Sequence, residues 1–407
     1  MKITLVADVY GEGNNGTSIT AKRLVENLKN RGHEVKVISA ASESDFVLPE
    51  RKIPVFQNYI NKQNGVAFAD VDEEKLREGI AGSDVVHILL PFRVGREGMK
   101  IARELHIPYT TAFHCQPENI TSHIGMKNWT YLNKKFYKKF LKQFYKDVEF
   151  IHCPSQFIAD ELTKNGYKAR KYVISNGVIP KIHPEPTEKP KQYKDKICIL
   201  CIGRHSKEKR HDLLINAANK SKYRDKIQLF FAGNGPLKDK LVKMGEKLPL
   251  KPRIEFFDFE ELQQILNYAD LYVHPSDIEI EAISCIEAFT CGRVPVISNS
   301  KRSATKQFAL TENNLFEVGN AQSLADKIDY WIEHPEEKEE LSKKYIEYAK
   351  QFSIDKCVDK MEQMFKDAVE FYKDYYKNLP ETPLKPHIEY PENPEEHIVK
   401  PKKKDIK

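Results

Sequence analysis

Short apolar runs alternate with stretches of helical periodicity along most of the chain. This alternation predicts parallel sheets with helical crossovers, an α/β fold. In the first part a helix is expected over residues 17–31, and the expected strands are 3–8, 34–39, 85–89, 109–113, 149–153 and 171–174. We therefore predict a doubly wound, Rossmann-like domain over residues 1–178.

Residues 176–196 are rich in proline and charge, which predicts a linker over 179–195. The pattern then restarts, with strands expected over 197–202, 226–232, 253–257, 271–273 and 294–297, and helices over 210–222, 236–247 and 260–268. This predicts a second Rossmann-like domain over 196–352. Such sheets bind ligands at the carboxyl ends of their strands, so two of them favour a cleft with one ligand from each side.

The pattern changes in the last part of the chain. From residue 321 the pattern is helical, and its last helix, expected over 353–378, is predicted to pack back on the first domain. Residues 379–407 combine prolines with charge and end in a lysine-rich run, which predicts a disordered tail.

The composition sets only broad limits on the class of protein. The 407 residues suffice for two full-sized domains, and the formal net charge of +6 is small beside a 30% charged fraction. The first apolar run is too short for a signal peptide, and no later run approaches the roughly 20 apolar residues that span a bilayer. We therefore expect a cytoplasmic protein.

Two carboxylates stand eight residues apart, Glu279 and Glu287, within a predicted strand, loop, helix and strand over 271–299. The helix is apolar on most sides, so a buried Glu287 needs a partner. Glu279 precedes the expected helix start near Glu281, where unpaired N–H groups favour an anion such as phosphate. This predicts a phosphorylated ligand nearby; the alternative is a Glu287 paired with a core Arg or Lys.

Gly11, Gly13 and Gly16 match the dinucleotide pattern G-x-G-x-x-G after the first strand. An NAD site also wants an acid at the end of the second strand, yet the nearest is Glu43, beyond it. The glycines then indicate a close backbone approach to a phosphate or sugar, or a simple turn.

The segment GRHSKEKR over 203–210 follows the first strand of the second domain. Its Arg204 and Lys209 have the charges that a leaving nucleotide diphosphate needs. Solvated surface charge is the alternative.

His114 stands at the carboxyl end of the strand expected over 109–113, where it is either functional or structural. Gln116, Glu118 and Asn119 follow it and supply polar groups for a hydroxylated acceptor.

Residues 126–146 contain seven lysines interleaved with aromatic residues. An apolar face at helical spacing comprises Trp129, Leu132, Phe136, Phe140 and Phe144, and the lysines beside it include Lys134, Lys135, Lys138, Lys139 and Lys142. The pattern is typical of a basic amphipathic helix on an anionic membrane surface. A packed core stripe with a solvated lysine face fits equally well. Nucleic acid is not an expected partner, because no recognised module surrounds the patch.

Taken together, these motifs make the chain resemble a family 4 glycosyltransferase of the GT-B fold over residues 1 to about 370. The motif E-x7-E is met by Glu279 and Glu287 and is followed by EAFTCGRVPVI. Gly203, Arg204 and Lys209 are similar to the family's Gly-Arg-x-x-x-Glu-Lys, with Glu208 as its acid, and VISNGV over 173–178 also matches.

The resemblance implies two facing Rossmann-like domains and a retaining transfer without a metal or cofactor. By analogy, Arg204 and Lys209 hold the diphosphate of a nucleotide sugar, with Gly16 near the phosphates. Further assignments by analogy are Glu279 to the donor sugar, Glu287 to the ribose, and His114 to the sugar and the incoming hydroxyl.

One departure concerns the loop after the last strand of the donor motif, which reads NSKRSATKQFAL where the family often carries a glycine pair. Ser303, Ala304 and Thr305 are therefore expected to meet the donor differently. Together with FHCQPENITSHIG over 113–125 and the lysine-aromatic helix, this loop resembles bacterial diacylglycerol or ceramide glucosyl- and galactosyltransferases.

The expected activity is that of a hexosyltransferase that moves glucose or galactose from a UDP-sugar to a membrane lipid, at the inner face of the cell membrane. Three alternatives remain open. The first is transfer to a polyprenyl-linked or soluble saccharide in capsule or cell-wall assembly, and the second is a nucleotide-sugar epimerase of the same architecture. The third is a non-catalytic two-domain protein that binds a nucleotide sugar.

Overall fold

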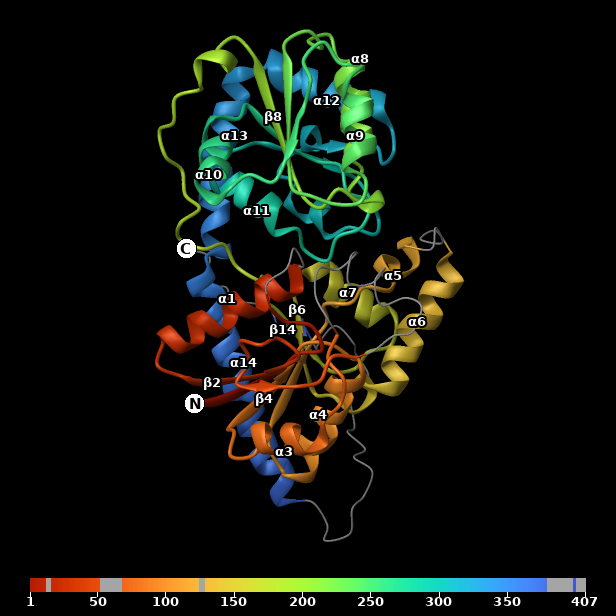
Figure 1. Cartoon of the computed structure of the whole chain (residues 1–407), viewed down its shortest axis with the longest axis vertical. Coiled ribbons are helices and arrows are strands. Elements are labelled where there is room, and N and C mark those ends of the chain that lie inside the picture. Colours follow the sequence, from red (N-terminus) through yellow and green to blue (C-terminus); the bar gives the residue numbers. More distant parts are fainter. Residues whose placement is uncertain (12–15, 52–67, 124–128, 379–397, 400–407) are drawn as a thin grey trace. The chain divides into compact units, whose positions relative to one another are not determined.

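Parallel strands with helical crossovers form both halves of the chain in the computed structural model (Figure 1). The residues described are 1–11, 16–51, 68–123, 129–378 and 398–399. They divide into two units, each considered by itself. Unit 1 takes the described residues of Met1–Thr121, Met126–Asn176 and Asp355–Lys407, and unit 2 takes those of Ser122–Gly125 and Gly177–Ile354.

In unit 1 the described strands form one sheet in the order β14-β7-β6-β5-β4-β1-β2-β3, and each pairing between them is parallel. The strands are β1 (Lys2–Val6), β2 (Glu34–Ser39), β3 (Phe46–Val47), β4 (Val85–Ile88), β5 (Tyr109–Ala112), β6 (Phe150–Cys153), β7 (Arg170–Val173) and β14 (Ile398–Val399). The predicted doubly wound sheet is thus confirmed, and the short strands β3 and β14 are additions to it.

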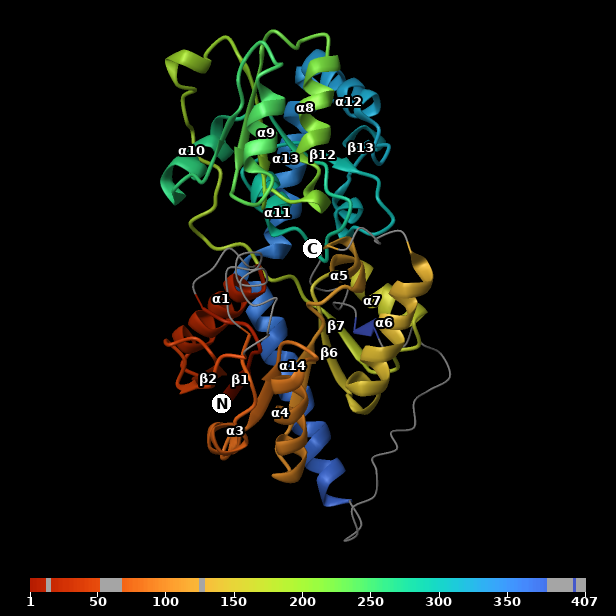
Figure 2. The same ribbon diagram turned by 45° about the vertical axis from the view of Figure 1, so that its right-hand side comes forward.

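The helices of unit 1 are α1 (Gly16–Asn30), α3 (Glu73–Ile80), α4 (Arg93–Glu104), α5 (Pro117–His123), α6 (Thr130–Gln143), α7 (Gln156–Lys164) and α14 (Ile354–Lys377). As predicted, α14 returns to unit 1, and Figures 1 and 2 both show it in blue beside the red and orange elements. Phe365 of α14 packs edge-on against His87 of β4 with ring centroids 5.5 Å apart. Asp367 of α14 accepts a 2.6 Å hydrogen bond from the Tyr172 hydroxyl of β7.

The disordered tail expected over 379–407 lies outside the described residues, except for Ile398–Val399. These two residues form β14 and pair in parallel with β7, so this part of the prediction is wrong. The apolar residues within the charged tail carry the β-propensity that a compositional argument overlooks.

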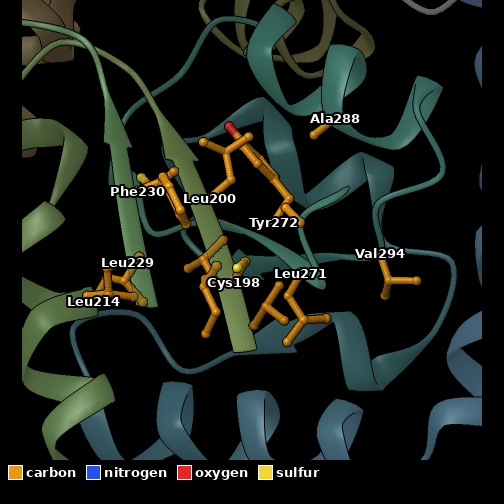
Figure 3. Close-up of a cluster of buried hydrophobic side chains, with 14 of the residues drawn as sticks. Cys198, Leu200, Leu214, Leu229, Phe230, Leu271, Tyr272, Ala288 and Val294 are labelled. Atoms are coloured by element: carbon orange, nitrogen blue, oxygen red, sulfur yellow. The ribbon is translucent and has the colours of Figure 1, made fainter. Parts of the chain in front are cut away.

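In unit 2 the described strands form a parallel sheet in the order β10-β9-β8-β11-β12-β13. The strands are β8 (Ile197–Ile202), β9 (Ile227–Ala232), β10 (Arg253–Glu255), β11 (Leu271–His274), β12 (Pro295–Ser298) and β13 (Leu315–Phe316). Because helices cover both faces of such a sheet, its central strands β8, β9, β11 and β12 are mainly apolar. Figure 3 shows Leu200 of β8, Phe230 of β9 and Tyr272 of β11 within the resulting buried cluster.

The helices of unit 2 are α8 (His211–Lys220), α9 (Lys238–Gly245), α10 (Phe259–Tyr268), α11 (Ile283–Thr290), α12 (Ala321–Glu333) and α13 (Pro335–Ala349). The segment 179–195, expected as a linker, is packed on this unit. Ile182 and Tyr193 are buried in its core, and Lys189 forms a 2.7 Å ion pair with Asp270. The proline-rich segment is therefore part of the packed unit and does not form a free linker.

The turn after β8 is held by the glycine-containing turn after β9. The Gly203 N–H donates to Ala232 O at 2.9 Å, and the His205 N–H donates to Asn234 O at 2.9 Å. A Cβ added to Gly235 would lie 2.6 Å from the His205 carbonyl oxygen and 2.7 Å from the His205 nitrogen. Only glycine therefore permits the two turns to approach so closely, and this contact fixes the backbone on both sides of His205.

We predict that Gly235→Ala lowers the free energy of unfolding by about 1–3 kcal/mol, because the added methyl group meets backbone that cannot rotate away. Urea unfolding followed by circular dichroism measures the effect. The control is Gly16→Ala at the exposed first residue of α1, where an added Cβ meets nothing within 4 Å. Equal stability of both variants would show that the two turns are free to separate.

Candidate active site

Three loops meet at the carboxyl edge of the unit 2 sheet. The loop after β11 contacts the turn after β8 through the Asp277 N–H, which donates to Glu208 O at 2.8 Å. The loop after β12 contacts the same β11 loop through the Ala304 N–H, which donates to Glu279 O at 2.9 Å. These backbone bonds bring residues from three crossovers into one place.

Glu279 forms the charged centre of this edge. Its Oε1 accepts from Lys209 Nζ at 2.6 Å and from His274 Nε2 at 2.9 Å. The side chains of Glu279 and His274 are 9% and 1% exposed, whereas that of Lys209 is 23% exposed. Solvent therefore reaches the pair from the lysine side.

Burial alone would raise the pKa of Glu279, but the charge of Lys209 and the hydrogen bonds from His274 and Lys209 hold it well below its ordinary range. Burial also opposes the charge on Lys209, and the neighbouring Glu279 carboxylate raises the pKa of Lys209 above its usual value. Both groups are thus ionised at neutral pH, and each stabilises the other's charge.

His274 and the residues behind it were not singled out from the sequence. Its Nδ1 is hydrogen bonded to the Tyr272 hydroxyl at 2.9 Å, and that hydroxyl bonds to Ser284 Oγ at 3.1 Å. Tyr272 and His274 alternate along β11 and so lie on the same face of the sheet. A histidine that closes an apolar strand at the ligand edge is the signal that could have identified it.

Arg204 lies half-buried in the turn after β8. Burial lowers the pKa of its guanidinium, and the charge of Glu208 opposes that effect only in part. Among the described residues, no carboxylate lies within ion-pair distance of Arg204. Arg210, also not predicted, is held differently, because its guanidinium pairs with Asp212 at 3.1 Å and with Asp277 at 3.5 Å.

Glu287 lies on α11. This helix begins at Ile283, close to the expected start near Glu281, and follows Ala282, which has a left-handed φ of 73°. Glu287 is half-exposed on this helix and does not lack an interaction partner. The most deeply buried acids of this stretch are Asp277 and Glu281, each 2% exposed.

The loop expected to meet the donor differently is ordered by its own hydroxyls. Ser303 Oγ bonds to Thr305 Oγ1 at 2.7 Å, and Ala304 and Thr305 begin a 3-10 turn over Ala304–Phe308. Ser300 Oγ donates to Asp277 O at 2.6 Å, which ties the loop to the one after β11.

In unit 1, His114 follows β5 and is buried beside His152, with ring centroids 5.3 Å apart. Burial, and then the neighbouring His152, lower the pKa of His114 to about 3. Burial also lowers the pKa of His152 to about 4. At neutral pH His114 is therefore an uncharged hydrogen-bonding group.

Of the three candidate acceptor residues, Gln116 is buried and Glu118 and Asn119 are half-buried. The Tyr137 hydroxyl of α6 donates to Glu118 Oε2 at 3.2 Å, and burial raises the pKa of Glu118. Tyr137 also stacks on Phe113 with ring centroids 6.0 Å apart, so α6 supports the segment that bears these residues.

Of the glycine motif, Gly13 lies outside the described residues. Gly11 has a φ of 109°, and Gly16 is the exposed first residue of α1. The buried Asp8, which the sequence did not single out, accepts from the N–H groups of Val94 and Gly95 at 3.1 and 3.2 Å. Burial raises the pKa of Asp8 to about 7, although those bonds oppose the shift.

The lysine-aromatic helix is shorter than the expected 126–146, since α6 covers Thr130–Gln143 and residues 124–128 lie outside the described ones. The predicted apolar stripe divides. Phe140 and Phe144 are buried, Phe136 is half-buried, and Trp129 is 53% exposed just before the helix. The exposed positions of α6 are Thr130, Tyr131, Lys134, Lys135, Lys138, Lys139, Lys142 and Gln143.

Among the helices that the structure describes, none combines the length and the apolar character that a bilayer crossing requires.

Two family descriptions match the sequence. Residues 14–181 match "Glycosyltransferase Family 4", and residues 184–352 match "Glycosyl transferases group 1". The first match covers the Rossmann-like part of unit 1 from α1 onward, and the second covers most of that of unit 2.

Individual proteins are more distantly similar. An alpha-monoglucosyldiacylglycerol synthase of Streptococcus pneumoniae is 25% identical over 318 residues, which cover 74% of this chain and 71% of that one. The solved structure of Anabaena Alr3699/HepE in complex with UDP-glucose covers 92% of this chain and 100% of its own, with 14% identity and a TM-score of 0.68. The catalytic domain of cholesterol-alpha-glucosyltransferase from Helicobacter pylori is 43% identical over 39% of this chain and 99% of its own, with a TM-score of 0.38. From the two family matches and the fold, the chain belongs to the family 4 glycosyltransferases of the GT-B fold, and it resembles bacterial glycolipid synthases.

Proposed function

We propose that this glycosyltransferase is a retaining, metal-independent hexosyltransferase that moves glucose or galactose from a UDP-sugar to the hydroxyl of a membrane lipid. Diacylglycerol and ceramide-like lipids are the proposed acceptors. The observation that carries the proposal is the ion pair of the half-buried Lys209 with the buried Glu279 in unit 2, with the half-buried Arg204 in the same turn as Lys209. Two cations suit a diphosphate, and a fixed carboxylate suits the sugar beside it.

In this proposal Arg204 and Lys209 bind the diphosphate and offset the negative charge that grows on it as the bond to the sugar breaks. Their two fixed charges perform the task that a metal ion performs in other transferases. Glu279 orients the sugar and stabilises positive charge at its anomeric carbon. Glu287, half-exposed on α11, binds the ribose hydroxyls.

The acceptor hydroxyl attacks the anomeric carbon on the face from which the diphosphate departs, and its proton passes to a phosphate oxygen. The products are UDP and a glycolipid with the donor's anomeric configuration. Gly16 is assigned to the phosphates, and His114 to the sugar and the incoming hydroxyl. An uncharged His114 accepts or donates a hydrogen bond there without adding charge.

Two observations support a lipid acceptor at the inner membrane face. The relative from Streptococcus pneumoniae carries diacylglycerol in its name. In addition, α6 contains five lysines and no acid, and exposed Trp129 and Tyr131 stand at its start. Lysines attract anionic lipid, and amphipathic aromatic rings favour the headgroup region, so we propose peripheral association through this surface.

Transfer should depend on Arg204. We expect Arg204→Gln to lower kcat/KM by about 100- to 1,000-fold, the usual loss for one charge-stabilising donor. Because Arg204 has no carboxylate partner among the described residues, the melting temperature should stay unchanged. The matched control is Lys207→Gln, an exposed cation of the same turn, which should retain full activity. Full activity of Arg204→Gln would remove this residue from the site.

Membrane binding should depend on α6. Replacing Lys134, Lys135, Lys138 and Lys139 by Gln should weaken binding to anionic liposomes by about 4 kcal/mol, at roughly 1 kcal/mol per lysine. Flotation measures this. The control replaces four exposed lysines of unit 2, Lys220, Lys240, Lys243 and Lys247, and makes the same change in net charge. Equal loss in both sets would assign binding to net charge alone.

Product mass tests the activity itself. UDP-glucose, UDP-galactose, UDP-N-acetylglucosamine and GDP-mannose are each supplied with diacylglycerol, ceramide, cholesterol, a polyprenyl phosphate or no acceptor. We expect a hexosyl lipid from a UDP-hexose, with the anomeric configuration of the donor by NMR. A saccharide product on the polyprenyl carrier, or an epimerised donor without acceptor, would instead establish one of the two alternative activities.

A further inference from the structure

Both hydrogen bonds to the Glu279 carboxylate end on the same oxygen, Oε1, but they come from groups of different kinds. Lys209 lies on the solvent side, 23% exposed, and carries a charge that a diphosphate also needs. His274 lies on the inner side, 1% exposed, where a donor substrate does not reach. One partner is thus open to competition from a ligand, and the other is not.

A diphosphate competes with Glu279 for Lys209, because it carries more negative charge than one carboxylate and approaches from the exposed side. When Lys209 turns toward the diphosphate, Glu279 loses its 2.6 Å bond to the ammonium group. A buried carboxylate without a partner is costly and has no fixed direction. A second, immobile donor is therefore needed to keep Glu279 aimed at the sugar.

His274 meets that requirement. We propose that His274 is a positioning residue that holds Glu279 in place while the donor diphosphate draws Lys209 away. The inference rests on the proposed function for the identity of the diphosphate. The carboxylate only accepts, so the bond at 2.9 Å requires that His274 Nε2 carries a proton.

The histidine ring is itself fixed from behind. Its Nδ1 bonds to the Tyr272 hydroxyl at 2.9 Å, that hydroxyl bonds to Ser284 Oγ at 3.1 Å, and Ser284 Oγ donates to Ile202 O at 3.4 Å. The Tyr272 ring is fully buried in the apolar cluster, and Figure 3 shows its hydroxyl oxygen in red. This chain links strands β8 and β11 with helix α11, so the ring has little freedom to rotate.

Two variants of His274 distinguish the role of Nε2, which faces Glu279, from that of Nδ1, which faces Tyr272. Glutamine at 274 places its terminal amide nitrogen near the position of Nε2 and retains a donor for Glu279, whereas asparagine reaches only the position of Nδ1. We expect His274→Asn to lower kcat about 10- to 100-fold with little change in the KM for UDP-sugar. His274→Gln should recover most of that loss. The control, His183→Asn, changes a histidine of unit 2 that is 54% exposed.

A purely structural role predicts a different pattern. In that case both His274→Gln and His274→Asn would lose activity in proportion to a lowered melting temperature, and His274→Gln would have no higher kcat than His274→Asn. That result would overturn the proposal, as would full activity of His274→Asn.

The competition between Glu279 and the diphosphate for Lys209 has its own test, which does not require sugar transfer. In calorimetry with UDP, Glu279→Gln should bind about 3- to 10-fold more tightly than the wild type, because Lys209 is released for the diphosphate. Unchanged affinity would overturn the competition. If the wild type binds UDP more weakly than Glu279→Gln does but glycosylates no acceptor, the proposed function is refuted. The competition for Lys209 is then still supported.

Discussion

The ionised Glu279 carboxylate in a buried position is the constraint on which the ligand edge of unit 2 depends. A charge at 9% exposure is tolerated only with partners, and here they come from two crossovers, Lys209 after β8 and His274 at the end of β11. Lys209 is in turn placed by a turn that the backbone around Gly235 holds closely. The fold thus determines the electrostatics of the site through contacts that are largely backbone or buried.

Most of the fold follows from the sequence because parallel strands buried on both faces are continuous apolar runs. The strands Glu34–Ser39 and Ile197–Ile202 have their predicted bounds, and most others differ by a few residues at an end. Periodicity is uninformative for two-residue strands such as β3, which are defined by their hydrogen-bonded neighbour. It is equally uninformative about which proline-rich segments pack, as residues 179–195 do.

The sequence indicated the charged residues of the site but not how they are arranged. Arg204, Lys209 and Glu279 were singled out by their place after strands, and the structure joins Lys209 to Glu279. The bond between His274, at the end of β11, and Glu279 was not predictable, because it depends on the path of the loop that follows the strand. For Glu287 the sequence indicated a buried position, whereas its side chain is half-exposed on α11.

The two interpretations of the lysine-aromatic segment are compatible, because they concern different sides of α6. Its inner side is a structural element, with Tyr137 stacked on Phe113 and bonded to Glu118, and with Asn133 Oδ1 accepting from Thr121 at 2.7 Å. Its lysines point outward. The inner side of α6 holds the segment that follows His114 through buried contacts. Because buried contacts are closely packed, a displacement of α6 would also displace that segment. A surface that met lipid at α6 would therefore also bear on the residues assigned to the acceptor.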